Sequence, residues 1–174
     1  MTISPLQKAR YQYEPKLPGM LRSGVDKIAV KEGEPTQSVA DQETIKSLFP
    51  NTYGKNEITF VEGESTASPD KQVVGVILSG GQAPGGHNVI CGLYDALKAA
   101  SPENVLIGFK NGPSGLIDDD FVVFDDEFID KYRNTGGFDI IGSGRTKLET
   151  EEQFKVAADV AKKHGMNAIC HHWR

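Results

Sequence analysis

The chain has 174 residues, of which 38% are hydrophobic and 25% are charged, and this length and composition suffice for one compact hydrophobic core. Its 19 Lys and Arg against 24 Asp and Glu give a formal net charge of -5, which argues against a nucleic-acid or anionic-membrane surface. No apolar run approaches the roughly 18 residues of a membrane span, and residues 1–16 lack a signal-peptide core. The two cysteines, Cys91 and Cys170, are too few for a disulfide framework and fit a reducing compartment. We therefore expect a soluble cytoplasmic protein with no nucleic-acid partner and no membrane partner.

Residues 1–70 are predicted to form an irregular N-terminal arm, because six of the nine prolines lie there and apolar periodicity is weak. Within the arm, residues 44–49 predict a short helix that ends before Pro50, since proline disfavours helical conformation in the preceding residue. Residues 58–62 alternate between apolar and polar side chains, as an edge strand does. We expect no strand–helix unit of the main fold in this arm.

Residues 71–174 have the pattern of a layered α/β domain. Residues 73–78 are a continuous apolar run rich in β-branched side chains, typical of a strand covered on both faces. Residues 89–100 show helical periodicity, and residues 105–109 and 121–124 predict two further strands. Alternating strands and helices predict a Rossmann-like parallel sheet that binds ligands at the carboxyl ends of its strands.

The C-terminal part of this domain contains a fourth strand-like segment and a helix with clear end signals. Residues 138–141 are predicted to form a strand that leads into a glycine loop. Thr150 and Gln153 have capping-box spacing at the start of a helix, and Gly165 is placed to end it. Its predicted apolar face consists of Phe154, Ala157, Ala158 and Ala161, and residues 166–169 begin another strand.

The loop over residues 79–88 follows a buried strand and opens a helix. Its four glycines, Gly80, Gly81, Gly85 and Gly86, leave room for backbone N–H groups to converge on an anion at the positive end of the helix. The loop matches neither the GxxxxGK[ST] nor the GxGxxG pattern, so it is not the usual ATPase or dinucleotide loop. We interpret it as a phosphate-binding loop; the alternative is a tight turn that uses glycine only for its geometry.

The second glycine loop, residues 142–147, places Arg145 and Lys147 just beyond a predicted strand end, at the same sheet edge as the first loop. The planar guanidinium group suits two-point contact with phosphate oxygens, and the lysine adds a point charge. The alternative is an arginine in a surface ion pair. His87, in the first loop, is interpreted as an orienting hydrogen bonder and not as a catalytic base. Two acidic groups, residues 118–120 and 125–127, are interpreted as solvated turns and, less favourably, as metal ligands.

The two loops carry a resemblance to a known family. VVGVILSGGQAPGGHNVI, GFKNGPSGLI and TGGFDIIGSGRTKLETEEQF together resemble the long-chain pyrophosphate-dependent 6-phosphofructokinases, with the catalytic rather than the regulatory subunit pattern. The likeness covers residues 72–169 and extends to Tyr13–Pro18. It implies reversible transfer of a phosphoryl group from pyrophosphate to the 1-hydroxyl of fructose 6-phosphate, a step of glycolysis, with Mg²⁺. Arg145 is the implied catalytic residue, and the implied diphosphate-binding residues are Gly80, Gly81, Gln82, Gly85, Gly86, Arg145 and Lys147.

Other parts of the family pattern are missing from this sequence. The stretches that the resemblance assigns to Mg²⁺, to the catalytic base and to the sugar phosphate lie beyond its last residue. The ending Cys170-His-His-Trp-Arg174 stands where Val-Ile-Ile-Gly-Gly is expected. Codons for this ending, read from their second base, can spell Val-Ile-Ile-Gly-Gly, so we hypothesise a single-base frameshift and expect an inactive fragment. A zinc or copper site at residues 170–172 is the less favoured alternative. At full length we expect a homo-oligomer.

Two other functions stay open at this point. One is an ATP-dependent relative, although Gln82 and residues 85–88 favour the pyrophosphate type. The other is a non-catalytic phosphate-binding or regulatory module.

Overall fold

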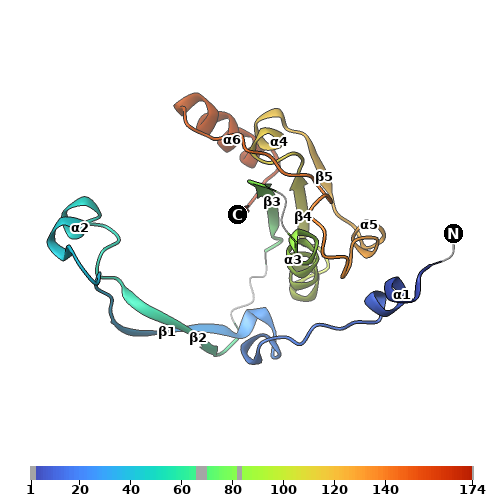
Figure 1. Ribbon diagram of the computed structural model, residues 1–174, viewed down its shortest axis with the longest axis horizontal. Helices are drawn as coiled ribbons and strands as arrows, with labels where there is room; N and C mark the ends of the chain where they lie inside the picture. The colour runs from blue at the N-terminus through green and yellow to red at the C-terminus, as the bar shows by residue number, and fades with distance from the viewer. Residues whose placement is uncertain (1–2, 66–69, 82–83, 174) are drawn as a thin grey trace. The chain divides into compact units, whose positions relative to one another are not determined.

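The computed structural model describes residues 3–65, 70–81 and 84–173 (Figure 1). Contacts divide the chain into two compact units, one of Met1–Pro15 with Ser68–Arg174 and the other of Lys16–Ala67. The second segment of the larger unit begins at Ser68, close to the domain boundary predicted after residue 70. The first 15 residues, in contrast, cluster with the α/β part of the chain.

A four-stranded sheet with the order β5-β4-β3-β6 organises the larger unit. Central strand β3 (Val73–Ser79) lies parallel to both β4 (Val105–Phe109) and β6 (Ala168–Trp173). Edge strand β5 (Phe121–Val123) runs antiparallel to β4, because the short connection between them cannot make the long crossover that a parallel pair requires. The predicted α/β class with a parallel sheet is therefore confirmed, with one antiparallel edge strand added.

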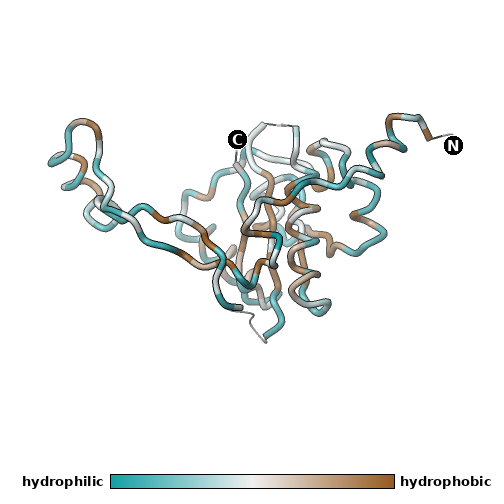
Figure 2. The backbone as a smooth tube through the Cα atoms, turned by 90° about the horizontal axis from the view of Figure 1, so that it is seen from below, coloured by the Kyte–Doolittle hydropathy of each residue, from teal (hydrophilic) through white to brown (hydrophobic). Residues whose placement is uncertain are grey.

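Helices cover both faces of this sheet (Figure 1). Val76 and Leu78 pack in one core cluster with α3 (Gly86–Ala100) and α5 (Asp126–Asp130). Ile77, between them, packs in a second cluster with α4 (Pro113–Asp118) and α6 (Glu151–Lys163). Successive side chains of a strand point to opposite faces, so a strand buried on both sides needs an uninterrupted apolar run. Figure 2 shows the apolar segments gathered in these central strands and in α3.

The strand predicted over residues 138–141 is wrong, although the apolar side chains of Phe138, Ile140 and Ile141 are buried as expected. The ring of His87 accepts the backbone N–H groups of Asp139 and Ile140, and the N–H of Asn111 donates to the carbonyl of Ile141. These backbone groups of residues 139–141 therefore bond to a side chain and to a turn, and they are not available to pair with a neighbouring strand. The apolar pattern indicated burial, not extended pairing.

Helix α6 has the predicted capping box. The hydroxyl of Thr150 accepts the N–H of Gln153 at 3.2 Å, and the Gln153 side chain accepts the N–H of Thr150 at 3.1 Å. The buried face is formed by Ala157 and Val160, whereas Phe154 is 55% exposed. The buried face of α6 is therefore rotated about the helix axis relative to the predicted one, because the helix contacts the sheet and α4 through positions 157 and 160.

The smaller unit is built on a two-stranded hairpin. Strand β1 (Ile28–Pro35) pairs antiparallel with β2 (Asn56–Glu62), which contains the strand predicted at 58–62. Helix α2 (Gln42–Leu48) lies between them and ends just before the predicted stop at Pro50. Short 3-10 helices at Gly19–Leu21 and Val25–Lys27 precede β1. None of the described residues between 16 and 65 is buried.

Helix α1 (Pro5–Tyr11) precedes this hairpin in the chain and belongs to the larger unit. The side-chain amide of Asn134 donates to the carbonyls of Arg10 and Tyr13 at 3.0 and 2.8 Å, which attaches the segment after α1 to the turn after α5. Among the helices of the described residues, none combines the length and apolar character that crossing a membrane requires.

Candidate functional site

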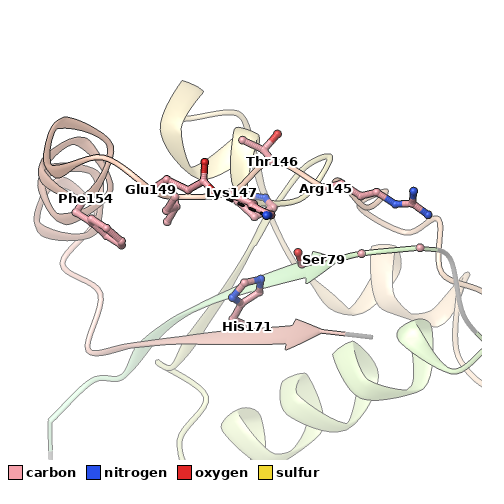
Figure 3. Close-up of a pocket in the computed structure, with 11 residues that line it drawn as sticks. Ser79, Arg145, Thr146, Lys147, Glu149, Phe154 and His171 are labelled. Atoms are coloured by element: carbon pink, nitrogen blue, oxygen red, sulfur yellow. Dashed lines mark ion pairs between the residues drawn. The ribbon is translucent and has the colours of Figure 1, made fainter. Parts of the chain in front are cut away.

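An open cavity of about 710 Å³ lies at the carboxyl end of β3 (Figure 3). Its walls come from the end of this strand and the glycines after it, from the loop that leads into α6, and from β6. This is the sheet edge at which α/β proteins bind ligands. The cavity is lined by Ser79, Gly80, Gly81, Pro113, Arg145, Thr146, Lys147, Leu148, Glu149, Phe154 and His171.

Backbone hydrogen bonds join the loops that form the cavity. The N–H of Gly80 donates to the carbonyl of Gly144 at 2.9 Å, and Ser79 and Gly144 form an isolated parallel bridge. The turn after β4 approaches the same point so closely that a Cβ atom on Gly144 would overlap the carbonyl oxygen of Asn111. Glycine at position 144 is thus required by close backbone approach. The ends of β3 and β4 and the second loop are one packed arrangement.

The guanidinium group of Arg145 lies beside the first glycine loop, where a Cβ atom on Gly81 would be 3.5 Å from its Nη2 atom. Arg145 is exposed, and no ion pair or hydrogen bond of its side chain is found within the described residues. Lys147, in contrast, lies 3.6 Å from the carboxylate of Glu149, with both side chains 68% exposed. Such an exposed pair is weak, so it competes only modestly with an incoming anion. Arg145 is the cation that this loop presents without a carboxylate partner.

The structure brings together four of the seven predicted binding residues, since Gly80, Gly81, Arg145 and Lys147 all line the cavity. Gln82 lies outside the described residues. Gly85 and Gly86 are absent from the cavity wall: the N–H of Gly85 donates to the carbonyl of Gly136 at 2.8 Å, and a Cβ atom on Gly86 would overlap the ring of Phe138.

Two of the glycines predicted to bind the anion have partners within the protein for their N–H groups. The N–H groups of Gly80 and Gly85 bond to carbonyls of the protein and do not point at an anion. Both residues have a positive φ, 90° for Gly80 and 101° for Gly85, and this backbone conformation favours glycine. The binding roles assigned to all seven residues stay predictions.

His171 was missed as a cavity residue because the sequence pattern of β6 ends at residue 169. In the structure the strand continues through residues 170–173, and alternation places its neighbouring side chains on opposite faces. Cys170 packs against one core cluster and the ring of His172 lies 6.1 Å from that of Phe138, whereas His171 lines the cavity. The three side chains therefore do not converge on one metal ion.

The two acidic groups have structural partners. Asp119 accepts hydrogen bonds from Lys163 and His164, and these bonds, that of Lys163 most strongly, lower the pKa of its carboxyl group. Asp125 caps α5 by accepting the N–H of Phe128 at 2.8 Å. In the part of the chain that the structure describes, no three or more His, Cys, Asp or Glu side chains group around a point where a metal ion could bind.

Comparison with known proteins defines the class of protein to which this fold and cavity belong. Residues 73–171 match the phosphofructokinase family, and the chain is a member of it. The chain is 44% identical to the pyrophosphate–fructose 6-phosphate 1-phosphotransferase of Treponema pallidum over 97% of its own length and 31% of that protein. It is 47% identical to the protein of the same name from Porphyromonas gingivalis, over 97% of this chain and 30% of that one. The resemblance to pyrophosphate-dependent phosphofructokinases stated from the sequence is thus confirmed, and the chain spans about a third of these relatives' length.

A solved structure shares the fold. The pyrophosphate-dependent phosphofructokinase of Nitrosospira multiformis superposes with a TM-score of 0.52 at 20% identity, over 59% of this chain and 26% of that protein. This likeness supports the α/β architecture around β3.

Proposed function

We propose that this chain carries the donor-binding part of an enzyme that transfers a phosphoryl group from pyrophosphate to the 1-hydroxyl of fructose 6-phosphate. The observation that carries the proposal is the position of Arg145, an arginine without a carboxylate partner among the described residues, beside Gly81 at the carboxyl end of β3. The relatives that align along nearly the whole chain are named for pyrophosphate and fructose 6-phosphate, which favours pyrophosphate over ATP as donor.

Phosphoryl transfer depends on positioning and on neutralising charge more than on covalent chemistry. The guanidinium group of Arg145 would hold two oxygens of the transferring phosphoryl group and would stabilise the charge that develops on them. Lys147 would add a second positive charge when the anion displaces Glu149 from it. Gly81 keeps the cavity wall beside the guanidinium group free of a side chain, so that the anion can lie against the backbone.

The resemblance implies Mg²⁺, but the described residues around the cavity do not provide a set of oxygen ligands for this ion. Glu149 is the one carboxylate among the cavity residues, and it is paired with Lys147. Magnesium requires several oxygen ligands in octahedral geometry. The described residues therefore do not fit a magnesium site.

The proposal extends to the setting of the reaction. The proposed acceptor is fructose 6-phosphate, and the proposed setting is glycolysis in the cytoplasm. The full-length enzyme is proposed to be a homo-oligomer. Several relatives are named as alpha and beta subunits, which supports assembly of subunits in this family. We also propose that this chain alone has no turnover, and formation of fructose 1,6-bisphosphate by the isolated chain would contradict that.

Calorimetric titration with pyrophosphate tests the donor site. Arg145→Ala is expected to weaken binding at least about tenfold, because a hydrogen bond to a charged group contributes about 1.5–3 kcal/mol. Lys155→Ala is the matched control: it removes one positive charge from the exposed surface of α6, away from the cavity wall. Equal affinities of wild type and Arg145→Ala, or an equal loss in both variants, would contradict a specific donor site. Tighter binding of ATP than of pyrophosphate would favour the ATP-dependent alternative.

A further inference from the structure

His87 is a buried histidine that does not line the cavity but contacts the segment leading into it. It lies in the first turn of α3 and its side chain is 5% exposed. Its Nδ1 atom is 2.6 Å from the hydroxyl of Thr135, and its Nε2 atom is 3.1 Å from the backbone nitrogens of Asp139 and Ile140. One imidazole ring thus joins the start of α3 to both ends of the segment 135–140.

These contacts identify one protonation state of the ring. The hydroxyl of Thr135 donates its proton to the carbonyl of Tyr132 at 2.6 Å, so at the contact with Nδ1 the ring must be the donor. At the other side two backbone N–H groups donate to Nε2, which requires a lone pair there. Both sides therefore agree on a neutral imidazole with its proton on Nδ1.

The carboxylate of Asp139 acts against the neutral state of the His87 ring. One oxygen of its carboxylate is 2.8 Å from Nε2, a position that favours a protonated ring, but this carboxylate is 76% exposed and is well solvated. Tyr132 contacts the ring edge-on with centroids 4.9 Å apart and brings no charge. Burial lowers the pKa of His87, and this effect exceeds the opposite effect of Asp139. Protonation would place a hydrogen on Nε2 and abolish its acceptance of both N–H groups.

The segment that His87 holds is continuous with the loop that carries Arg145. Backbone bonds attach this segment to three places in the fold. At the start of α3, the N-cap residue Gly85 and His87 donate to the carbonyls of Gly136 and Gly137. After β4 and β3, Asn111 and Gly80 donate to the carbonyls of Ile141 and Gly144. Between the attachments at residues 137 and 141, the N–H groups of Asp139 and Ile140 have no acceptor among the described residues other than the His87 ring. The ring therefore satisfies the backbone donors in the middle of the segment.

We propose that neutral His87 is a positioning residue that holds residues 136–144, and through them the guanidinium group of Arg145, against the first glycine loop. Its role in ligand binding rests on the proposed pyrophosphate site. Its role in fixing the segment does not, because that role depends only on the hydrogen bonds to Nε2. Protonation of the ring releases the segment and weakens the anion site.

The first experiment needs neither ligand nor variant. Nitrogen chemical shifts of the labelled ring at pH 7.5 should show Nδ1 protonated and Nε2 unprotonated, and the amides of Asp139 and Ile140 should be protected from hydrogen exchange. As the pH is lowered until the ring nitrogen shifts show that Nε2 gains a proton, the protection factors of these two amides, corrected for intrinsic rates, should fall at least about tenfold. A proton on Nε2 at pH 7.5, or unchanged protection while Nε2 is protonated, would overturn the proposal.

The second experiment compares His87→Ala, His87→Gln and the control His164→Gln, which removes a histidine that bonds to Asp119 on the opposite face of the sheet. His87→Ala should lower protection at residues 139–145 and weaken pyrophosphate binding about tenfold. His87→Gln, whose amide oxygen can accept in place of Nε2, should recover part of both, and the control should change neither. Wild-type protection in His87→Ala would refute the positioning role. Absence of pyrophosphate binding by the wild type would refute the proposed function, while hydrogen exchange still decides the role of His87.

Discussion

Replacing Gly144 by alanine should destabilise the protein, because its Cβ atom would overlap the carbonyl oxygen of Asn111 and lie 3.5 Å from the Cα atom of Gly112. The backbone at position 144 does not have a positive φ, so the penalty comes from space alone. Relief requires the second loop to move away from the turn after β4. That movement breaks the hydrogen bonds from Gly80 to Gly144 at 2.9 Å and from Asn111 to Ile141 at 2.8 Å.

Two backbone bonds at about 1 kcal/mol each give an expected loss of about 2 kcal/mol. For a chain of this size, each kcal/mol lowers the melting temperature by about 2–4 °C, so a decrease of roughly 4–8 °C is expected by circular dichroism. The control is Gly92→Ala, at an exposed position within α3 where the new methyl group meets nothing within 4 Å. This change should raise stability by up to about 1 kcal/mol through helix propensity. Shifts of the same sign in both variants would refute the close-approach argument.

Two further substitutions separate binding from stability. Gly81→Ala should leave the melting temperature unchanged, because its Cβ atom meets only the Arg145 side chain at ordinary contact distance, yet it should weaken pyrophosphate binding about tenfold by calorimetry; unchanged affinity would exclude Gly81 from the site. Asp119→Asn should lower stability at pH 7 by about 1 kcal/mol, through its exposed bond to Lys163 and its bond to His164. Because the pKa of Asp119 is lowered in the folded protein, this stability is present above its ordinary value of 3.8 and is lost as pH falls through the lowered pKa. Urea titrations from pH 7 to pH 2 should show the two proteins converging, and a constant difference would contradict the assignment.

The parts of the fold that could be predicted are those in which burial and secondary structure coincide. Strand β3 is buried on both faces, so its sequence is an uninterrupted apolar run, and this pattern is typical of few other secondary-structure elements. The segment 138–141 shows the limit: its side chains are equally buried, but the groups that bond to its backbone come from a histidine about 50 residues earlier in the chain. Strand β1 was not predicted because the hairpin is exposed on both sides, so its pattern carries no burial signal.

The candidate site was predictable in its cations and less so in its glycines. A glycine-rich loop at the end of a strand, a second glycine loop and an arginine within it are local features, and the structure places parts of both loops around one cavity. Which N–H groups face a ligand depends on contacts between loops, and these cannot be found from either loop alone. The N–H of Gly80 donates to Gly144, from the other loop, and the positive φ of 90° at Gly80 favours glycine there.

Charge pairing explains how an acidic chain keeps a cation for an anionic ligand. Carboxylates pair with Lys110, Lys131, Arg133 and Lys163. Arg133, bonded to Asp95 at 2.7 and 3.1 Å, has a raised pKa and fixes α3 to the turn after α5. Arg145 follows a loop of glycines, with no acidic residue before it closer than Asp139 and none after it before Glu149. The positions of the carboxylates in the fold, and not the net charge of -5, therefore leave the guanidinium group of Arg145 without a carboxylate partner among the described residues.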